Sequence, residues 1–451
     1  MKRRLGTSAV VAAGVAFAAL APAPAQASAP QPRIIDTTVI TEVTPLGYKV
    51  TGLALEYDGA IDLGTADIDE TAFAVRVALT RPGASPLEGA RTVVDAYASD
   101  RPAFSDAQRA GSFIILELDE NEPLSAGSYN EGGFTRLFDL VGSYSVAQVA
   151  SVVGAAADTS HPGNGEKAQK LNGHPGRTVV NDDVIDLIVD DYAAGSYTAP
   201  SGATLPYRMF TPALDAESSY PLVVTLHGYG ESGSGNIEQI AGNQLSVAFA
   251  DPLRQARHAA FVLSPQADPT DPSKGAWWSP SMQTAVIELV EKTIADNPRI
   301  DPSRVYLSGL SMGSYGSWGI LGQRSDLFAG ALLVCGAGSE AAAVANLTEF
   351  PIWAVHSVDD SIVAYDAPGS DYRIFRALQA AGVPVTWSEW SGLLPDAEQE
   401  ALAAAALTAA QADGSEHLFT TFSAGTTPLF DHGSWIPTYT NDIMIDWLFA
   451  Q

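Results

Sequence analysis

The chain has 451 residues, of which 46% are hydrophobic and 17% are charged, and its formal net charge is −28. This balance is typical of a globular protein with a large core and excludes a disordered chain. The negative charge repels phosphate backbones and anionic lipid heads, so no nucleic-acid or membrane-surface partner is expected. The length predicts about two to three domains.

The first 27 residues read as a secretory signal peptide. Residues 2–4 are Lys-Arg-Arg, an apolar run rich in Ala and Val follows over 5–20, and the chain then reaches a small-x-small cleavage site that ends at Ala27. The apolar run is short for a membrane span, and no stop-transfer pattern follows it. We therefore expect a secreted protein without a membrane anchor.

Residues 32–141 are predicted to form a small all-β domain. Short apolar runs such as 72–79 and 112–118 are separated by turn residues, and no long helical period appears. This pattern indicates an antiparallel β-sandwich. Residues 142–194 have no clear period and contain a stretch rich in Gly, Pro, Asn and Lys, so we interpret them as a linker or irregular segment.

From residue 195 to 451 the pattern changes to apolar strands that alternate with helices. Continuous apolar strands separated by helices predict a mostly parallel sheet with helices on both faces. In such a sheet the ligand site lies beyond the carboxyl ends of the strands. The strand-like runs are 221–226, 259–263, 305–308, 331–334, 352–355 and 385–387, and the helical patterns include 282–297 and 372–381.

Cys335 is the single cysteine of the chain, which excludes an intrachain disulfide. It follows directly on the apolar run 331–334, so we expect a thiol packed in the core rather than a nucleophile.

The segment Gly-Leu-Ser-Met-Gly at 309–313 fits the G-x-S-x-G nucleophile elbow, with Ser311 as the nucleophile. A predicted strand at 304–308 precedes it and a predicted short helix at 315–322 follows. The glycines allow a sharp turn and leave the surroundings of the serine free of side chains. Because a serine hydroxyl is a poor nucleophile until a base takes its proton, the motif requires a histidine and an acid elsewhere in the chain.

In hydrolases with a G-x-S-x-G elbow, the acid and then the base follow the serine along the chain. Only His417 and His432 are therefore candidates for the base. His432 lies among turn residues, whereas His417 opens a predicted strand in which it caps or packs; we therefore predict His432 as the general base. The acid is either Asp359 or Asp360, which both follow the strand that ends near Val355. Adjacent carboxylates point apart, so only one of them can reach the histidine.

The oxyanion formed on acyl attack also needs donors. His-Gly-Tyr-Gly-Glu at 227–231 follows a buried strand and fits the loop that provides one backbone N–H, here that of Tyr229. The backbone N–H of Met312, next to the nucleophile, is the second candidate. Trp277 and Trp278 follow another strand, and they either line an apolar substrate cleft or pack in the core.

Together these motifs resemble the bacterial esterases related to polyhydroxybutyrate depolymerases, over roughly residues 197–451. In that family the acid is the aspartate four residues after the histidine of an H-G-x-x-D-x-x-V pattern, which implies Asp360 here, although Ser357 replaces the glycine. The base is a histidine followed closely by Ser-Trp, which implies His432. The matching segments are 226–231, 309–313, 356–363 and 432–435.

The resemblance implies an α/β-hydrolase fold for 195–451. Some of these esterases carry an immunoglobulin-like domain in front, and the β pattern of 32–141 is similar to that arrangement. One departure is an inserted segment at 392–428, which contains an Ala-rich predicted helix.

We therefore expect a secreted serine carboxylic-ester hydrolase that acts through a Ser-His-Asp triad and an acyl-enzyme intermediate on a small or polymeric ester, with no cofactor and no metal. The first alternative is a serine peptidase of the prolyl-oligopeptidase type, although the propeller repeats of about 40–50 residues that such enzymes carry are not seen. The second is a polyester (polyhydroxyalkanoate-like) depolymerase.

Overall fold

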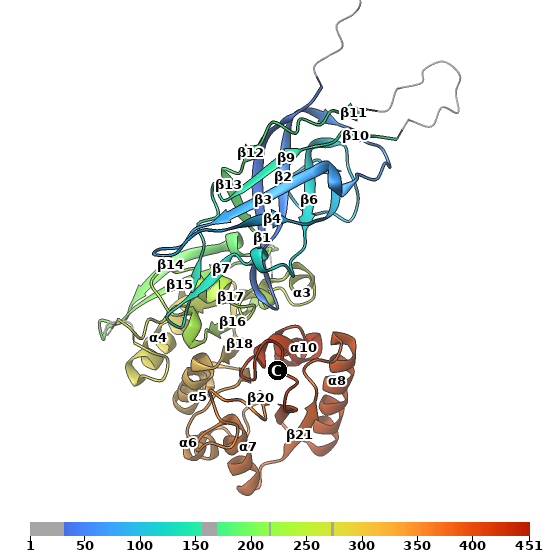
Figure 1. Ribbon diagram of the computed structural model, residues 1–451. Helices are drawn as coiled ribbons and strands as arrows, with labels where there is room; N and C mark the ends of the chain where they lie inside the picture. The colour runs from blue at the N-terminus through green and yellow to red at the C-terminus, as the bar shows by residue number, and fades with distance from the viewer. Residues whose placement is uncertain (1–30, 156–168, 216–217, 272–274) are drawn as a thin grey trace, which may run out of the picture.

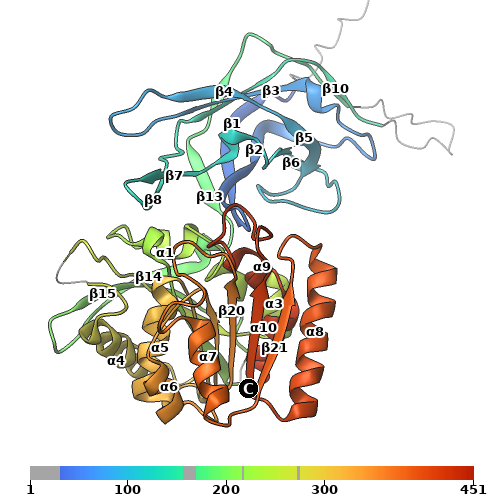
Figure 2. The same cartoon turned by 60° about the horizontal axis from the view of Figure 1, so that its bottom comes forward.

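The computed structural model describes residues 31–155, 169–215, 218–271 and 275–451. The predicted signal peptide at 1–27 lies outside the described residues. An all-β domain at the N-terminal end of the described chain packs against a larger α/β domain (Figures 1 and 2).

The N-terminal domain has two sheets that enclose one core, as the alternating pattern predicts. Along β3 the residues alternate strictly between buried and exposed from Phe73 to Leu79, which is the signature of a strand with one face on a core. The first sheet has the order β13 (Asp183–Asp186), β1 (Ile34–Thr44), β2 (Gly47–Ile61), β6 (Gly111–Leu118), β5 (Val93–Ser99). The second has the order β12 (Val179–Val180), β9 (Tyr144–Gln148), β3 (Phe73–Leu79), β4 (Leu87–Arg91). Two short pairs complete the domain: β7 (Ser128–Glu131) with β8 (Phe134–Leu137), and β10 (Val152–Val153) with β11 (Lys170–Leu171).

Residues 142–194, which the sequence suggested as a linker, contribute strands to both of these sheets. β9 pairs with β3 in the second sheet, and β13 pairs in parallel with β1 at the edge of the first. Their runs are two to five residues long, too short for a period-2 pattern to stand out from the polar residues around them. The described residues of this segment are therefore part of the sandwich up to β13.

The α/β domain is built on one sheet, for which nine strands are described. All neighbouring strands from β17 to β21 run parallel, while β15 is antiparallel to both of its neighbours. The inner strand β16 is buried at every residue, as expected for a strand covered on both faces. The strand order is β14 (Tyr192–Thr198), β15 (Thr204–Phe210), β17 (Phe261–Pro265), β16 (Tyr220–Leu226), β18 (Ile300–Leu310), β19 (Gly330–Val334), β20 (Ile352–Ser357), β22 (His417–Phe422), β21 (Val385–Trp390).

Helices cover both faces of this sheet, and successive strand residues point into two different cores. Leu307 packs in the core of one face, while its neighbour Tyr306 packs in the core of the other. The first face is covered by α4 (Pro280–Asp296), α5 (Met312–Arg324), α6 (Glu340–Asn346) and α7 (Asp371–Ala380). The second is covered by α1 (Glu238–Ala241), α2 (Val247–Ala250), α8 (Asp396–Asp413), α9 (Trp435–Tyr439) and α10 (Asp442–Phe449), with α3 (Pro252–Arg257) beside them. This is the α/β-hydrolase architecture that the sequence predicted.

The segment 392–428 is more than a surface insertion. It contains α8, which ends at Gly414 in the left-handed conformation, and then β22. β22 pairs in parallel with β20 on one side and with β21 on the other. The segment therefore places a buried strand inside the sheet, and the chain leaves that strand for the loop that carries His432.

Candidate active site

Ser311 lies at the turn between β18 and α5, with φ 50° and ψ −120°. Residues other than glycine seldom adopt such a conformation, and it persists only where the surrounding structure enforces it. Both glycines of the motif are sterically required: a Cβ on Gly309 would lie 2.6 Å from Ser317 Oγ, and one on Gly313 would overlap the carbonyl of Leu226. The turn presents the Ser311 side chain to a cleft beyond the carboxyl end of β18.

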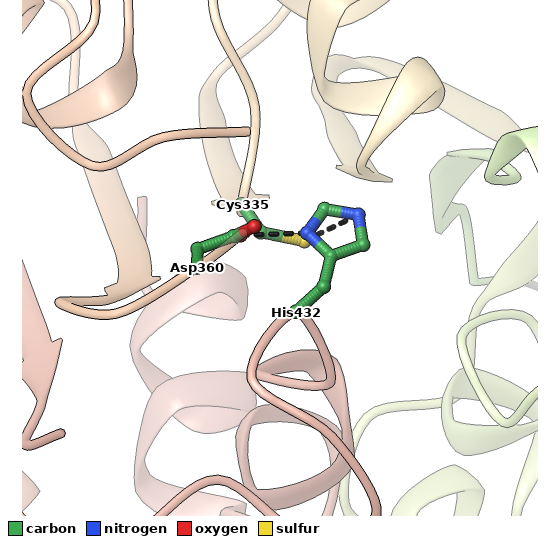
Figure 3. Close-up of side chains that lie close together, drawn as sticks. All are labelled: Cys335, Asp360 and His432. Atoms are coloured by element: carbon green, nitrogen blue, oxygen red, sulfur yellow. Dashed lines mark hydrogen bonds and ion pairs between the residues drawn. The ribbon is translucent and has the colours of Figure 1, made fainter. Parts of the chain in front are cut away.

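His432 comes from the loop between β22 and α9 and lies beside the serine. Its Nε2 is 2.9 Å from Ser311 Oγ, and its Nδ1 is 2.6 Å from Asp360 Oδ2 (the latter shown in Figure 3). The ring can therefore accept the serine proton at Nε2 while it donates its Nδ1 proton to the carboxylate.

Asp360, not Asp359, is the carboxylate that contacts the histidine. Its Oδ1 accepts hydrogen bonds from the backbone N–H groups of Ile362 and Val363 at 2.9 and 2.8 Å, which leaves Oδ2 to His432. Asp359 is exposed, and its carboxylate accepts from Ser357 Oγ and from a backbone N–H across the loop. The two side chains point apart, as adjacent residues after a strand are expected to do.

A second buried histidine, His356, stands behind Asp360. Its Nδ1 lies 3.1 Å from Asp371 Oδ2, and its Nε2 donates to the carbonyl of Val363 at 2.8 Å and lies 3.3 Å from Asp360 Oδ2. Both ring nitrogens thus face acceptors only, which is the arrangement of an imidazolium with two N–H donors. Although burial opposes the charge, Asp360 and Asp371 raise the pKa of His356 to about 10.

The electrostatics around the triad follow from the same contacts. Burial by itself would raise the pKa of Asp360, but hydrogen bonds from His356 and His432 hold it well below its usual range. Burial lowers the pKa of His432, but Cys335 Sγ at 4.0 Å and the Asp360 carboxylate outweigh that effect and raise it. Asp360 is therefore ionised at neutral pH and stabilises the protonated form of His432.

Backbone donors for an oxyanion are available on two sides of Ser311. α5 begins at Met312, so its N–H has no acceptor within the helix. The short 3-10 turn η4 (Tyr229–Glu231) begins at Tyr229, whose N–H is free of the turn for the same reason.

His227 holds the loop that carries Tyr229. Its Nδ1 donates to the carbonyl of Gly228 at 2.6 Å, and its Nε2 accepts from the N–H of Ala267 at 3.0 Å. Burial lowers the pKa of His227 to about 4, so the ring is neutral. Trp277 Nε1 donates to the carbonyl of His227 at 3.1 Å and adds a further bond to the loop.

Both domains line the cleft around Ser311, which has a volume of about 410 Å³. The α/β domain supplies residues 228–231, which we call the oxyanion loop because Tyr229 is a candidate donor, together with the elbow and the loops that carry Ile362 and His432. The N-terminal domain supplies Pro45, Leu46 and Gly47 from the β1–β2 turn and Asn130, Gly133 and Thr135 from the β7–β8 hairpin. No motif in the sequence indicated that the N-terminal domain reaches this cleft.

The β7–β8 hairpin also contacts the oxyanion loop directly. The ring of Phe134 stacks on the ring of Tyr229, with centroids 5.2 Å apart. Arg136 Nη1 donates to the carbonyl of Ser232 at 3.1 Å. The hairpin therefore holds the loop through contacts that are separate from those of His227.

The paired tryptophans do not line this cleft. Trp277 is buried in the core, where its ring packs edge-on against His227. Trp278 is half-exposed and packs against Tyr315, and it is not among the residues that line the cleft. Of the two alternatives, packing in the core therefore holds for Trp277, and neither residue lines this cleft. The aromatic residues of the cleft are Tyr229, Phe430 and Trp435.

Within the described residues, one cluster brings together three side chains that could ligate a metal: Cys335, Asp360 and His432 (Figure 3). Both His432 nitrogens are already engaged, one by Asp360 and the other by Ser311. An ion could enter only by replacing these hydrogen bonds. Cys335 itself is fully buried after β19, as the sequence predicted.

The comparisons with known proteins agree with this architecture. A family model described as the esterase Ig-like N-terminal domain matches residues 36–161, beyond the predicted end of the sandwich at 141. The solved structure of a thermostable esterase is 28% identical to the chain, with a TM-score of 0.71, and covers 93% of this chain and 100% of its own. No curated protein matches the chain.

Two further structures are similar at lower levels. An S-formylglutathione hydrolase from Agrobacterium tumefaciens is 15% identical, with a TM-score of 0.38, and covers 57% of this chain and 94% of its own. The Pyrococcus horikoshii acylaminoacyl peptidase is 11% identical, with a TM-score of 0.39, and covers 89% of this chain and 74% of its own.

The chain is thus a carboxylesterase-like serine hydrolase with an α/β-hydrolase fold behind an immunoglobulin-like N-terminal domain. The predicted resemblance to esterases with such a domain is confirmed. In the part of the chain that the structure describes, no helix combines the length and the apolar character needed to cross a membrane.

Proposed function

We propose that the protein is a secreted hydrolase of carboxylic esters, in which Ser311, His432 and Asp360 act as a catalytic triad. The observation that carries this proposal is the continuous chain of contacts from Ser311 Oγ through His432 to Asp360, at 2.9 and 2.6 Å. The similarity to the thermostable esterase over nearly the whole chain supports esters as the substrates.

In the first half of the reaction Ser311 Oγ attacks the ester carbonyl while His432 Nε2 takes the hydroxyl proton. The negative charge that develops on the carbonyl oxygen is stabilised by the N–H groups of Tyr229 and Met312. The protonated His432 is stabilised by Asp360 and then gives its proton to the leaving alcohol. The products of this half are the free alcohol and an acyl group on Ser311.

In the second half water attacks the acyl-enzyme, and His432 takes a proton from that water. The same two N–H groups stabilise the second oxyanion. Collapse of this intermediate releases the carboxylic acid, and the proton returns to Ser311 Oγ. In both halves His432 transfers the proton, and the N–H groups of Tyr229 and Met312 stabilise the oxyanion.

Secretion rests on the leader at 1–27. We infer that the mature chain begins after Ala27, because the apolar run and the small-x-small site have the form of a signal peptide. Mass spectrometry of the N-terminus of protein recovered from the culture medium tests this; an intact leader on that protein would contradict it.

The function is tested with a series of p-nitrophenyl esters of increasing acyl length, together with the matching p-nitroanilides, on the wild type and on Ser311→Ala. Turnover of esters by the wild type and a loss of about 10⁴-fold or more in the variant are expected. Equal turnover by the variant would overturn the role of Ser311. Cleavage of the anilides without ester turnover would favour the peptidase alternative.

A further inference from the structure

Exposed aliphatic side chains gather at the cleft around Ser311. Ile362 and Leu429 are each 68% exposed and Leu46 is 45% exposed, and all three line the cleft. We call these three residues the aliphatic rim. Single exposed apolar residues are common on a folded protein, but several around one cleft are typical of a binding surface, because they are stabilised only when a ligand covers them.

The aliphatic rim is assembled from both domains. Leu46 lies in the turn between β1 and β2, and this end of the N-terminal domain lies close to the loops around α9 (Figure 2). Ile362 follows the acid Asp360 closely in the chain, and Leu429 lies a few residues before the base His432. A group bound to the rim is therefore next to the reacting atoms.

Leu429 has a backbone conformation that favours glycine. Its φ is 64°, and the N–H of Phe430 donates to the carbonyl of Pro428 at 2.8 Å, so Leu429 is the central residue of a tight three-residue turn. In the same loop a positive φ of 71° is met by a glycine, Gly425. Strained residues of this kind occur mainly at functional sites. A leucine here exposes its side chain at a conformational cost, which points to a use for that side chain in the cleft.

The charged groups of the cleft limit what the aliphatic rim can bind. Apart from Tyr229, the ionisable side chains that line the cleft are His432 of the triad and Glu231, which is buried. No Lys or Arg is among the described lining residues, although the chain has 24 of them. An anionic group would therefore find no counter-charge at the rim, whereas an uncharged aliphatic chain needs none.

We propose that the aliphatic rim binds an aliphatic chain of the ester, so that the N-terminal domain takes part in the choice of substrate. This inference rests on the ester hydrolysis proposed above. The acyl chain and the alcohol chain both extend from the carbonyl that Ser311 attacks, and either of them can reach the rim. Each CH₂ that leaves water at the rim stabilises the bound transition state, so kcat/KM rises with chain length.

The test measures kcat/KM for two series of esters, each kept below its solubility limit. The acyl series is p-nitrophenyl acetate, butanoate and hexanoate; the alcohol series is ethyl, butyl and hexyl acetate, followed by titration of the released acid. Each value is divided by the hydroxide-catalysed rate of the same ester, which removes its intrinsic reactivity. For the wild type we expect the longest ester to exceed the shortest by at least about tenfold in one series, and that series identifies the chain on the rim.

Leu46→Ala and Leu429→Ala should each lower this long-to-short ratio by at least about threefold, because each removes apolar surface from the rim. A ratio compares two esters on the same enzyme, so a displacement of His432 that slowed both equally would not change it. The matched control is Leu393→Ala, because Leu393 is 61% exposed and does not line the cleft. If Leu429→Ala does not fold, Leu429→Gly removes the same side chain and relieves the strained φ.

A lower ratio in both rim variants but not in the Leu393 control supports the proposal. A fall in Leu429→Ala alone overturns the part of the N-terminal domain, and a fall in Leu46→Ala alone overturns the part of Leu429. Equal values for short and long esters in both series of the wild type overturn the rim while ester hydrolysis stands, as does a ratio that both variants leave unchanged or that falls equally in the control.

Sedimentation velocity at the assay concentration tests the other occupant, a second copy of the chain. A wild-type dimer that dissociates in Leu429→Ala with an unchanged ratio assigns the rim to that copy and overturns the proposal. If the wild type hydrolyses no ester of either series, the proposed function fails and this inference fails with it.

Discussion

The ring of Phe134 stacks on the ring of Tyr229 with centroids 5.2 Å apart and planes inclined by 26°. Phe134 belongs to the β7–β8 hairpin of the N-terminal domain, whereas Tyr229 opens the turn that carries a proposed oxyanion donor. The contact therefore joins the immunoglobulin-like domain to the loop that carries this proposed donor. A donor in an oxyanion hole is effective only when it is held in place before the reaction.

Phe134→Ala should lower kcat for short esters by about two- to tenfold, because an aromatic pair contributes about 0.5–1.5 kcal/mol. KM should change little, since the lost contact holds the donor and does not touch the substrate. Steady-state kinetics on p-nitrophenyl butyrate measure both. Tyr129→Ala is the control, because it removes a comparable ring contact, with Phe138, inside the N-terminal domain. Equal effects in the two variants would mean that only domain stability is involved.

Asp360→Asn should lower kcat by about 10⁴-fold, because an amide cannot stabilise the imidazolium and favours the wrong tautomer of His432. Asp359→Asn should change kcat by less than about threefold, since its carboxylate is exposed and faces Ser357 and the loop at Gly425. The same ester assay measures both variants. A large loss in Asp359→Asn with an active Asp360→Asn would reverse the assignment of the acid.

His356→Gln should lower kcat by between about ten- and a hundredfold, because Asp360 loses a buried partner that helps to orient it. The acid limb of the kcat/KM profile should also move. That limb reports the loss of a proton from His432, and removal of the His356 positive charge makes the surroundings more negative, which favours protonated His432. The pKa of His432 should rise, so the limb should shift to higher pH by at least about half a unit.

The groups that face the two rings are few. Asp360, Asp371, Tyr365 and Cys335 act on His356, while Asp360, Cys335 and Glu231 act on His432. His417→Gln is the control, since His417 is also buried but donates to the carbonyl of Leu347 away from the triad. A lower kcat with an unmoved acid limb in His356→Gln would show that His356 only packs and carries no charge.

Gly313→Ala should destabilise the fold by about 1–3 kcal/mol or more, because its Cβ would overlap the backbone of Leu226 in a tightly packed turn. Gly322→Ala, in the same helix α5, should instead be neutral or stabilising by up to about 1 kcal/mol. Its Cβ would meet only Ala342 Cβ at 3.5 Å, and alanine is the better helix former. Urea unfolding followed by circular dichroism measures both; a Gly313→Ala variant as stable as the wild type would contradict the steric account.

The sequence by itself determined the features that local patterns encode. The alternation of apolar strands and helices predicted the α/β sheet, and the period-2 runs before residue 141 predicted the sandwich. The elbow around Ser311 was visible because its glycines and the flanking strand and helix are adjacent in the chain. The choice of Asp360 over Asp359 depended on the resemblance to a family, and the structure then gave each carboxylate different partners.

Only the tertiary structure decided which residues form the walls of the cleft around Ser311. Leu46 and Thr135 reach it from a separate domain, Trp277 turns into the core, and β22 enters the sheet between β20 and β21. The contacts of His356 with Asp360 and Asp371 likewise emerge only when the chain is packed. Periodicity along a chain reports which face of an element is buried. It does not report which distant element covers that face, because the packing of two elements depends on the shape and charge of both surfaces.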